Sequence, residues 1–326
     1  MNENGGRLRE ALTKIAEVAS AAVSDSEYQD DAYDNDHASE HAPQQDMLAC
    51  TPKTLPKRLL MKAAETAVKI YPVNAPAFGP LAEVAPDFPL DPMHIAVLTS
   101  KYWGPSARRL TVSFMERTAA NLRARILSHM NAWSQVAGIS FVETQGTGDV
   151  RISRGSEGYW SYLGTDVLLI PKNRQTMNLQ GFTMNTPESE YKRVVRHETG
   201  HTLGFPHEHM RKELVERIDP AKAYEYFLRT QGWDQRMVDQ QVLTPLNELS
   251  LMSTPADQTS IMCYQLPGSI TRDGKPILGG VDINQTDYAF AGGIYPKPGG
   301  AQMSGRAQMS AYEDEWDESE DVEVPV

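Results

Sequence analysis

Four residues near the middle of the chain have the types and the spacing of a metal site. They are His197, Glu198, His201 and His207, in the run His-Glu-Thr-Gly-His-Thr-Leu-Gly-Phe-Pro-His. On a helix, residues four apart lie one turn above each other, so His197 and His201 can present imidazole nitrogens to a single cation. Gly204 can adopt a positive φ, which would end the helix and bring His207 back as a third ligand. We therefore predict a centre with three histidine ligands.

The number of ligands indicates the kind of centre. Three nitrogen ligands leave the fourth position of a tetrahedral zinc ion open for water, whereas structural zinc sites close it with protein atoms. Such an ion lowers the pKa of water to about 7, and Glu198 lies beside it as a candidate general base. Four of the eight histidines fall between positions 197 and 209, which favours one bound Zn²⁺ over scattered structural histidines. His209 is expected to face away from the metal, either beside the ligands or at the surface.

A second motif lies far downstream and, together with the first, carries a family resemblance. Residues 260–264 read Ser-Ile-Met-Cys-Tyr, and residues 204–211 read Gly-Phe-Pro-His-Glu-His-Met-Arg. The two segments resemble the metzincin metallopeptidases, and specifically the astacin family, whose zinc run continues as G-F-x-H-E-x-x-R. Residues 160–164 resemble the W-S-x-x-G segment of that family, and residues 287–296 resemble its final helix. The resemblance covers about residues 96–297.

The resemblance implies a role for each residue that matches the motifs. The three histidines would bind one catalytic Zn²⁺, Glu198 would act as general base for a metal-activated water, Met262 would form the floor beneath the metal, and Tyr264 would stabilise the oxyanion. The implied activity is that of a zinc-dependent endopeptidase acting on protein or peptide substrates. The implied fold is α+β, in two parts. A twisted mixed sheet and two long helices would lie above the cleft, and an irregular lower subdomain would carry a C-terminal helix.

Two other classes of function share these residues. A zinc hydrolase of a non-peptide amide or ester would use the same nucleophile, and a non-catalytic zinc-binding protein would need only the ligands. The second class would be expected to lose Glu198 or Tyr264, and both are present. The net charge of −12 argues against nucleic-acid partners, whose phosphates would be repelled, and against binding to anionic membranes.

The cysteine content departs from the astacin pattern. Astacins usually carry disulfides within the catalytic domain, but this chain has two cysteines, Cys50 and Cys263. It resembles the bacterial-type members without these bonds, and we expect core burial and zinc to hold the fold. Cys263 is expected to be a small buried residue. Cys50 lies upstream of the catalytic domain, where its thiolate could occupy the open zinc position; an ordinary unpaired thiol is the alternative.

Composition divides the chain into four segments. Residues 1–45 and residues 299–326 are acidic and polar and are expected to be disordered. Residues 46–95 form a helical and proline-rich extension, and residues 96–298 form the protease domain. The sequence leaves open whether the extension is a removable propeptide that inhibits the enzyme. Neither a signal peptide nor a membrane-spanning stretch is visible, so an extracellular location rests on the resemblance alone.

Periodicity and capping residues predict the elements that position the site. Helices are expected over 56–70, over 117–136, from Pro187 through the zinc run, from Asp219–Pro220 to Gly232, and after Asn284. Strands are expected over 110–115, 139–143, 149–153, 167–171 and 177–182. One of the last two strands is expected to line the cleft and to pair with an extended substrate.

Overall fold

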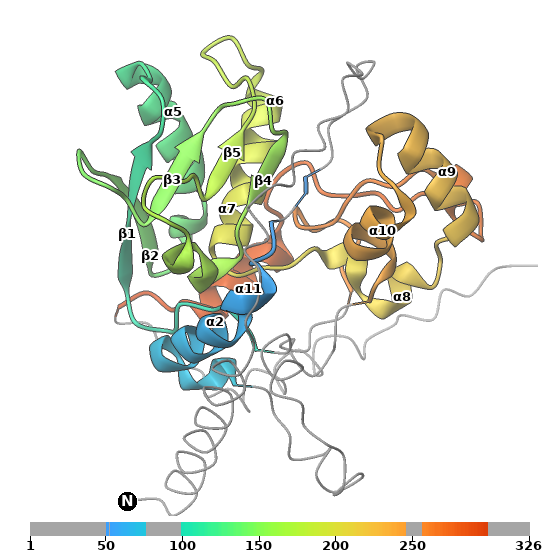
Figure 1. Cartoon of the computed structure of the whole chain (residues 1–326), viewed down its shortest axis with the longest axis horizontal. Helices are drawn as coiled ribbons and strands as arrows, with labels where there is room; N and C mark the ends of the chain where they lie inside the picture. Colours follow the sequence, from blue (N-terminus) through green and yellow to red (C-terminus); the bar gives the residue numbers. More distant parts are fainter. Residues whose placement is uncertain (1–49, 52, 76–98, 246–255, 299–326) are drawn as a thin grey trace, which may run out of the picture.

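The structure of the chain is a computed structural model that describes residues 50–51, 53–75, 99–245 and 256–298 (Figure 1). Within this part of the chain, two lobes lie side by side. The sheet lobe comprises residues 99–205, and the helical lobe comprises residues 206–245 and 256–283. The two segments expected to be disordered, and most of the proline-rich stretch, lie outside the described residues.

Five strands form the sheet lobe, in the order β2-β1-β3-β5-β4. Strands β2, β1, β3 and β5 run parallel, and β4 runs antiparallel to β5 at one edge. The central strand β3 is buried along its whole length, as is usual for parallel strands. The bounds are Arg108–Phe114 for β1, Ile139–Glu143 for β2, Val150–Ser153 for β3, Tyr159–Ser161 for β4 and Met177–Leu179 for β5. The mixed sheet of the expected α+β fold is therefore present.

Two long helices lie on one face of this sheet (Figure 1). The first is α5 (Ala120–Met130), whose apolar residues Leu122, Ile126 and Met130 are buried. The second, which we call the zinc helix, is a continuous run of three assigned pieces. They are α6 (Glu188–Glu190), a π-helical stretch η4 (Tyr191–Val195) and α7 (Arg196–Thr202). The zinc helix starts directly after Pro187, as predicted.

The helix predicted over 117–136 is too long, because it ends at Met130. The side chain of Asn131 accepts from the N–H of Phe141 and donates to its carbonyl oxygen, both at 2.9 Å. These two bonds tie the end of α5 to β2 and divert the chain into a short 3-10 turn, η2 (Trp133–Gln135). A long-range contact therefore shortens this helix.

The strand predicted over 167–171 is wrong, because the chain forms a 3-10 helix there, η3 (Gly164–Leu169). The buried guanidinium of Arg151 donates to the carbonyl oxygens of Val167 (3.5 Å) and Ile170 (3.1 Å), so these groups do not enter a ladder. The other candidate for the cleft-lining strand, β5, lies inside the sheet. The edge strand on this side of the sheet is β4 instead.

The helical lobe consists of short helices around a separate apolar core. That core includes Phe227, Val238 and Val242 together with Leu266 and Ile277. Its elements are η5 (Glu208–Met210), α8 (Lys212–Val215), α9 (Pro220–Gln231), α10 (Gln235–Val238), the π-helical η6 (Asp239–Leu243) and η8 (Gly268–Ile270). Helix α9 begins and ends where predicted, since Asp219 caps it and Gly232 leaves it with a φ of +69°.

Two further helices flank the sheet lobe. Helix α2 (Lys57–Ile70) belongs to the extension before the lobe and packs its buried alanines near η3, and a turn η1 (Pro72–Asn74) follows it. Helix α11 (Gln285–Ile294) ends the described chain and is capped by Asn284 as predicted. Its Ala291 joins the core of the sheet lobe. Among the described residues, no helix combines the length and the apolar character needed to cross a membrane.

Candidate active site

The zinc helix carries two of the predicted ligands, His197 and His201, one turn apart and buried. It contains a π-helical stretch, and such stretches are frequent at functional sites. Gly204, just past the helix, has a φ of +98°, and its N–H donates to the carbonyl oxygen of His201 (2.8 Å). A Cβ atom at this position would also meet the backbone oxygen of Lys101 at 3.1 Å. The glycine turn sends the chain back and delivers His207, as predicted.

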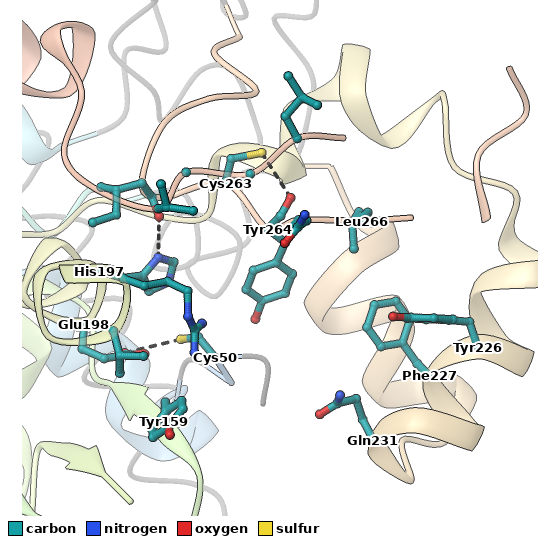
Figure 2. A pocket seen from close by; sticks show the side chains of 18 residues that line it. Cys50, Tyr159, His197, Glu198, Tyr226, Phe227, Gln231, Cys263, Tyr264 and Leu266 are labelled. Atoms are coloured by element: carbon teal, nitrogen blue, oxygen red, sulfur yellow. Dashed lines mark hydrogen bonds between the residues drawn. The ribbon is translucent and has the colours of Figure 1, made fainter. Parts of the chain in front are cut away.

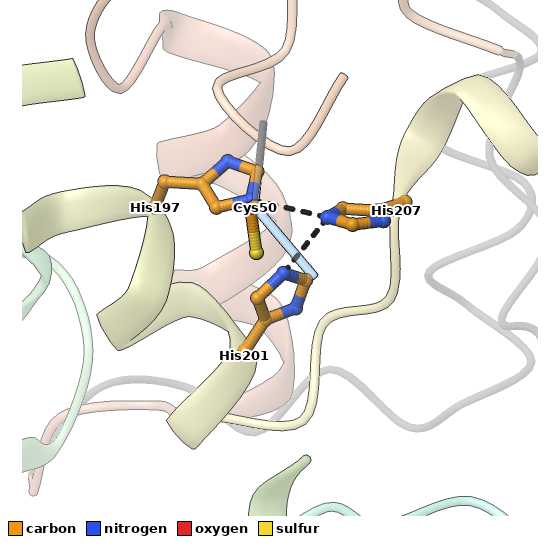
Figure 3. A group of neighbouring side chains, drawn as sticks. All are labelled: Cys50, His197, His201 and His207. Atoms are coloured by element: carbon orange, nitrogen blue, oxygen red, sulfur yellow. Dashed lines mark hydrogen bonds between the residues drawn. The ribbon is translucent and has the colours of Figure 1, made fainter. Parts of the chain in front are cut away.

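The three imidazoles converge through their Nε2 atoms (Figure 3). Nε2 of His207 lies 3.2 Å from Nε2 of His197 and 3.0 Å from Nε2 of His201. Nδ1 of His197 lies 2.6 Å from the backbone oxygen of Ile261, and Nδ1 of His201 lies 2.8 Å from that of Phe205. A carbonyl only accepts, so the Nδ1 atoms of His197 and His201 carry the protons, and their Nε2 lone pairs are available to a cation. Nδ1 of His207 has no partner among the described residues, so its Nε2 can serve as the third ligand atom.

The donor set and its spacing fit zinc. A tetrahedral ion with Zn–N distances of about 2.0–2.1 Å separates its nitrogen ligands by about 3.3 Å, close to the observed separations. Burial lowers the pKa of His197 to about 4, and it lowers the pKa values of His201 and His207 well below the usual value. All three are therefore neutral near neutral pH, which is the form that binds metal.

A fourth ligand atom comes from the extension before the sheet lobe. Sγ of Cys50 and one nitrogen from each of the three histidines lie within 4.8 Å of one another, and all four residues are buried (Figure 3). The Cys50 thiol also donates to Oε2 of Glu198 at 3.4 Å. Next to it, the N–H of Thr51 donates to the carbonyl oxygen of Tyr159 on the edge strand β4 (3.0 Å). Cys50 therefore places a fourth potential donor atom among the three histidine nitrogens.

Glu198 lies beside the ligands, with its carboxyl group directed toward Cys50 (Figure 2). It is 1 % exposed, and its Oε1 has no hydrogen-bond partner among the described residues. Burial raises its pKa to about 8, and the hydrogen bond from Cys50 and the charge of Arg193 oppose the shift. A divalent cation at the ligands would favour the carboxylate form.

Tyr264 approaches the ligands from the helical lobe. Its ring centroid lies 4.2 Å from that of His207 and 4.2 Å from that of His209, and it is stacked on His209 at 13°. Its hydroxyl is buried without a partner among the described residues. His209 is fully buried, and its Nε2 lies 2.9 Å from the backbone oxygen of Gln241. The surface location considered for His209 is therefore wrong, and its contact with Tyr264 is a feature that the sequence did not reveal.

Met262 packs beneath the zinc helix, in a turn that is fixed from two sides. The carboxylate of Asp287 in α11 accepts from the hydroxyl of Ser260 (2.6 Å) and from the N–H of Ile261 (2.9 Å). On the other side lies Gly200, where a Cβ atom would meet Sδ of Met262 at 2.4 Å. The glycine in the middle of the zinc helix thus makes room for the methionine.

A pocket of about 100 Å³ opens beside Glu198, between the zinc helix, β4, α9 and the chain that follows Met262 (Figure 2). Arg193 lines it and was not among the predicted site residues. Glu190 holds the guanidinium of Arg193 through contacts of 3.0 and 2.7 Å. Arg193 stands four residues before His197, one turn away on the same helix face, and that spacing is the signal that could have found it.

A comparison with models of known protein families identifies the family of this chain. The family model described as Astacin, a peptidase family, matches residues 97–278, more than half of the 326 residues. The chain belongs to the astacin family. As an astacin it is a zinc metalloendopeptidase that acts on protein or peptide substrates, and the predicted family, α+β fold and zinc cofactor are confirmed.

Solved structures resemble this astacin to different degrees. Myroilysin shares 29 % sequence identity with a TM-score of 0.57, over 61 % of this chain and 96 % of myroilysin. High choriolytic enzyme 1, a hatching enzyme zinc-protease from the medaka fish Oryzias latipes, shares 20 % identity with a TM-score of 0.39, over 56 % of this chain and 86 % of that one. No curated protein matches the sequence. The myroilysin match supports the assigned fold over nearly all of that protein.

This astacin holds its fold without disulfides, because both of its cysteines are free and buried. Cys263 belongs to the core of the helical lobe, as expected for a small buried residue. Its thiol lies 3.6 Å from the backbone oxygen of Tyr264. Cys50, in contrast, is the thiol among the ligand atoms.

Proposed function

We propose that this astacin cleaves peptide bonds with Glu198 as general base and Tyr264 as oxyanion donor, and with His197, His201 and His207 as the ligands of one zinc ion. The convergence of three Nε2 atoms beside a buried carboxyl group carries the proposal. When bound there, zinc supplies a Lewis acid that polarises the scissile carbonyl and lowers the pKa of water. The remaining steps fall to the side chains.

Glu198 has the position and the surroundings of a proton carrier. It takes a proton from the attacking water and passes it to the amine nitrogen as the C–N bond breaks, so the carboxyl group ends unchanged. Burial favours its protonated form, raising the pKa to about 8, whereas a bound cation would favour the carboxylate. A carboxyl group balanced between these two influences is suited to proton transfer in both directions.

Tyr264 can supply a hydrogen bond that the substrate carbonyl needs in the transition state. Burial keeps its pKa well above the usual value, so the phenol stays protonated and able to donate. Its hydroxyl has no other partner among the described residues. A donor that is aimed before the reaction stabilises the negative charge developing on the oxygen without further rearrangement.

We infer that the edge strand β4 binds the backbone of the substrate. In this structure its outer edge is covered by the extension, through parallel bridges of Cys50 with Tyr159 and of Lys53 with Tyr162. When that segment leaves, the same backbone groups can pair with an extended peptide. The pairing would hold the scissile bond beside the ligands.

We also propose that residues 46–95 are a propeptide that keeps the enzyme latent. A thiolate from Cys50 would close the tetrahedron that catalysis needs open. The parallel bridges occupy the substrate edge, and a second anchor lies further along the extension. There the side chain of Asn74 donates to the carbonyl oxygen of Tyr102 (2.8 Å) and accepts from its N–H (3.1 Å). Residues 96–298 would then be the catalytic domain that cleavage of the extension releases.

The catalytic assignment is tested by comparing the wild type with Glu198→Gln on casein and on a peptide library, each with and without a chelator. Loss of the base should lower kcat about 10²–10⁴-fold, while the zinc content stays at one ion per chain. Full cleavage by the variant would contradict the role of Glu198. Hydrolysis of small esters or amides without any cleavage of peptides would favour the alternative hydrolase class.

The latency proposal is tested in the full-length chain with Cys50→Ala. Removal of the thiol should raise peptide cleavage about tenfold or more, since each factor of ten needs only about 1.4 kcal/mol of lost inhibitory contact. The matched control is Cys263→Ala, which removes the other buried thiol and should give no increase. Equal activity of Cys50→Ala and wild type would rule out the thiol as the inhibitory group.

A further inference from the structure

His209 stands apart from the other histidines of the site because it is not part of the group of converging ligand atoms. Its ring packs against that of His207, at 5.1 Å between centroids, and more closely against that of Tyr264. It is fully buried, at 0 % exposure, in the 3-10 turn η5 that follows His207. Its ring is nearly parallel to the phenol ring, at 13° and 4.2 Å between centroids. The two rings are therefore stacked, with the imidazole face of His209 packed against the phenol ring.

The orientation of the His209 ring is fixed from behind. Its Nε2 lies 2.9 Å from the backbone oxygen of Gln241 in the π-helical stretch η6. Because that oxygen can only accept, Nε2 carries the proton and donates. The ring is thus held by the helical lobe while its face stays against Tyr264.

Tyr264 needs such support, because its own polar group does not anchor it. Its hydroxyl is buried and has no partner among the described residues. The ring is held instead by its contacts with His207, at an interplanar angle of 51°, and with His209, at 13°. A buried hydroxyl without a partner is costly, so the ring would leave this pose if the contacts were removed.

We propose that His209 is a positioning residue for Tyr264. It fixes the phenol in the place from which the hydroxyl can donate to the oxyanion, and it keeps the ring from moving toward the metal. The inference rests on the proposed role of Tyr264. It predicts that His209 affects catalysis only through that tyrosine.

A double-mutant cycle tests this dependence in the full-length, zinc-loaded chain carrying Cys50→Ala. His209→Leu removes the flat ring and should lower kcat about tenfold with KM changed by less than about twofold, whereas in a Tyr264→Phe background it should change kcat by less than about twofold. His209→Phe keeps a flat ring but cannot donate to Gln241, and it should stay within about threefold of the parent.

A copper-substituted sample gives a readout that is independent of turnover. A phenolate bound to Cu(II) has a visible charge-transfer band, and His209→Leu should increase it because the phenol is no longer held away from the metal. The band must disappear with Tyr264→Phe. Should His209→Leu fail to bind metal, His209→Phe decides: a tenfold fall in its kcat overturns stacking as the cause.

Two patterns would overturn the inference, and they differ. The first is that His209→Leu lowers kcat equally with and without Tyr264, while Tyr264→Phe is itself impaired. His209 would then not act through Tyr264, and the proposed mechanism would stay intact. The second is that Tyr264→Phe keeps the full kcat, which would contradict both the oxyanion role of Tyr264 and the inference that rests on it.

Discussion

The two lobes contribute to the same site but are held together in different ways. The sheet lobe has an unbroken ladder of strands and a core in which Trp133 and Tyr191 are almost fully buried. The helical lobe has no strand among its described residues, and α8 and α10 span four residues each. Stability and precise placement are therefore unevenly distributed between the two parts of the active site.

The difference matters because the site residues come from both lobes. The sheet lobe supplies His197, Glu198 and His201 on one helix, while the helical lobe supplies His207 and Tyr264. A rigid helix fixes the relative positions of the first three. The other two depend on how the helical lobe is attached. A zinc ion held by the proposed ligands would join the two lobes, and the following predictions test how far it and its neighbours hold the lobes together.

The largest effect is expected from removal of zinc. A metal that binds only the assembled site stabilises it by the free energy of binding, on the order of several kcal/mol. We expect amides in α9 of the helical lobe to lose hydrogen-exchange protection when zinc is chelated. Amides in β1 of the same sample serve as the internal control and should change little. Equal loss in both lobes would show that the metal does not act at the boundary between them.

A smaller effect is expected where the lobes touch at Gly200. Alanine in a helix is normally more favourable than glycine by about 1 kcal/mol. Here, however, the alanine Cβ would meet Sδ of Met262 at 2.4 Å. We therefore expect Gly200→Ala to lower the free energy of unfolding by about 1–3 kcal/mol, as measured by urea denaturation.

A matched glycine in α11 controls for the helix effect itself. At Gly292 the added Cβ would lie 3.5 Å from Cβ of Val136, an ordinary contact. Gly292→Ala should therefore be neutral or stabilising by up to about 1 kcal/mol. If both substitutions have the same sign, the contact with Met262 is not what requires glycine in the zinc helix.

The smallest effect is expected within the helical lobe. The carboxylate of Asp219 accepts from the N–H groups of Ala221 (3.1 Å) and Lys222 (3.3 Å) at the start of α9. Loss of this cap in Asp219→Ala should cost about 1 kcal/mol, seen as faster amide exchange in α9 while β1 and the zinc content are unchanged. A comparable loss of protection in β1 would mean that the lobes unfold as one unit.

Local rules explain which parts of the site could be predicted. The i, i+4 spacing of His197 and His201 places both on one helix face, and Gly204 supplies the positive φ that turns the chain toward His207. The caps Asp219 and Asn284 begin helices where expected. These features depend on residues within a few positions of one another, and the sequence displays them directly.

Contacts between distant segments explain the errors and the omissions. The segment predicted as a strand over 167–171 became a 3-10 helix because its carbonyl groups meet the buried side chain of Arg151. Strand β4, rather than β5, forms the edge of the sheet because of the order in which the strands pair. His209 was placed against Tyr264 by the packing of the helical lobe.

The sequence by itself determined the family, and it displayed the three proposed zinc ligands and the adjacent carboxyl group as residue types at fixed short spacings. Only the tertiary structure brought a fourth potential donor, the thiol of Cys50, among the three histidine nitrogens. Cys50 and Glu198 meet although 148 positions separate them along the chain. No local pattern encodes such a meeting, since it depends on how the extension lies along β4 and across the ligands.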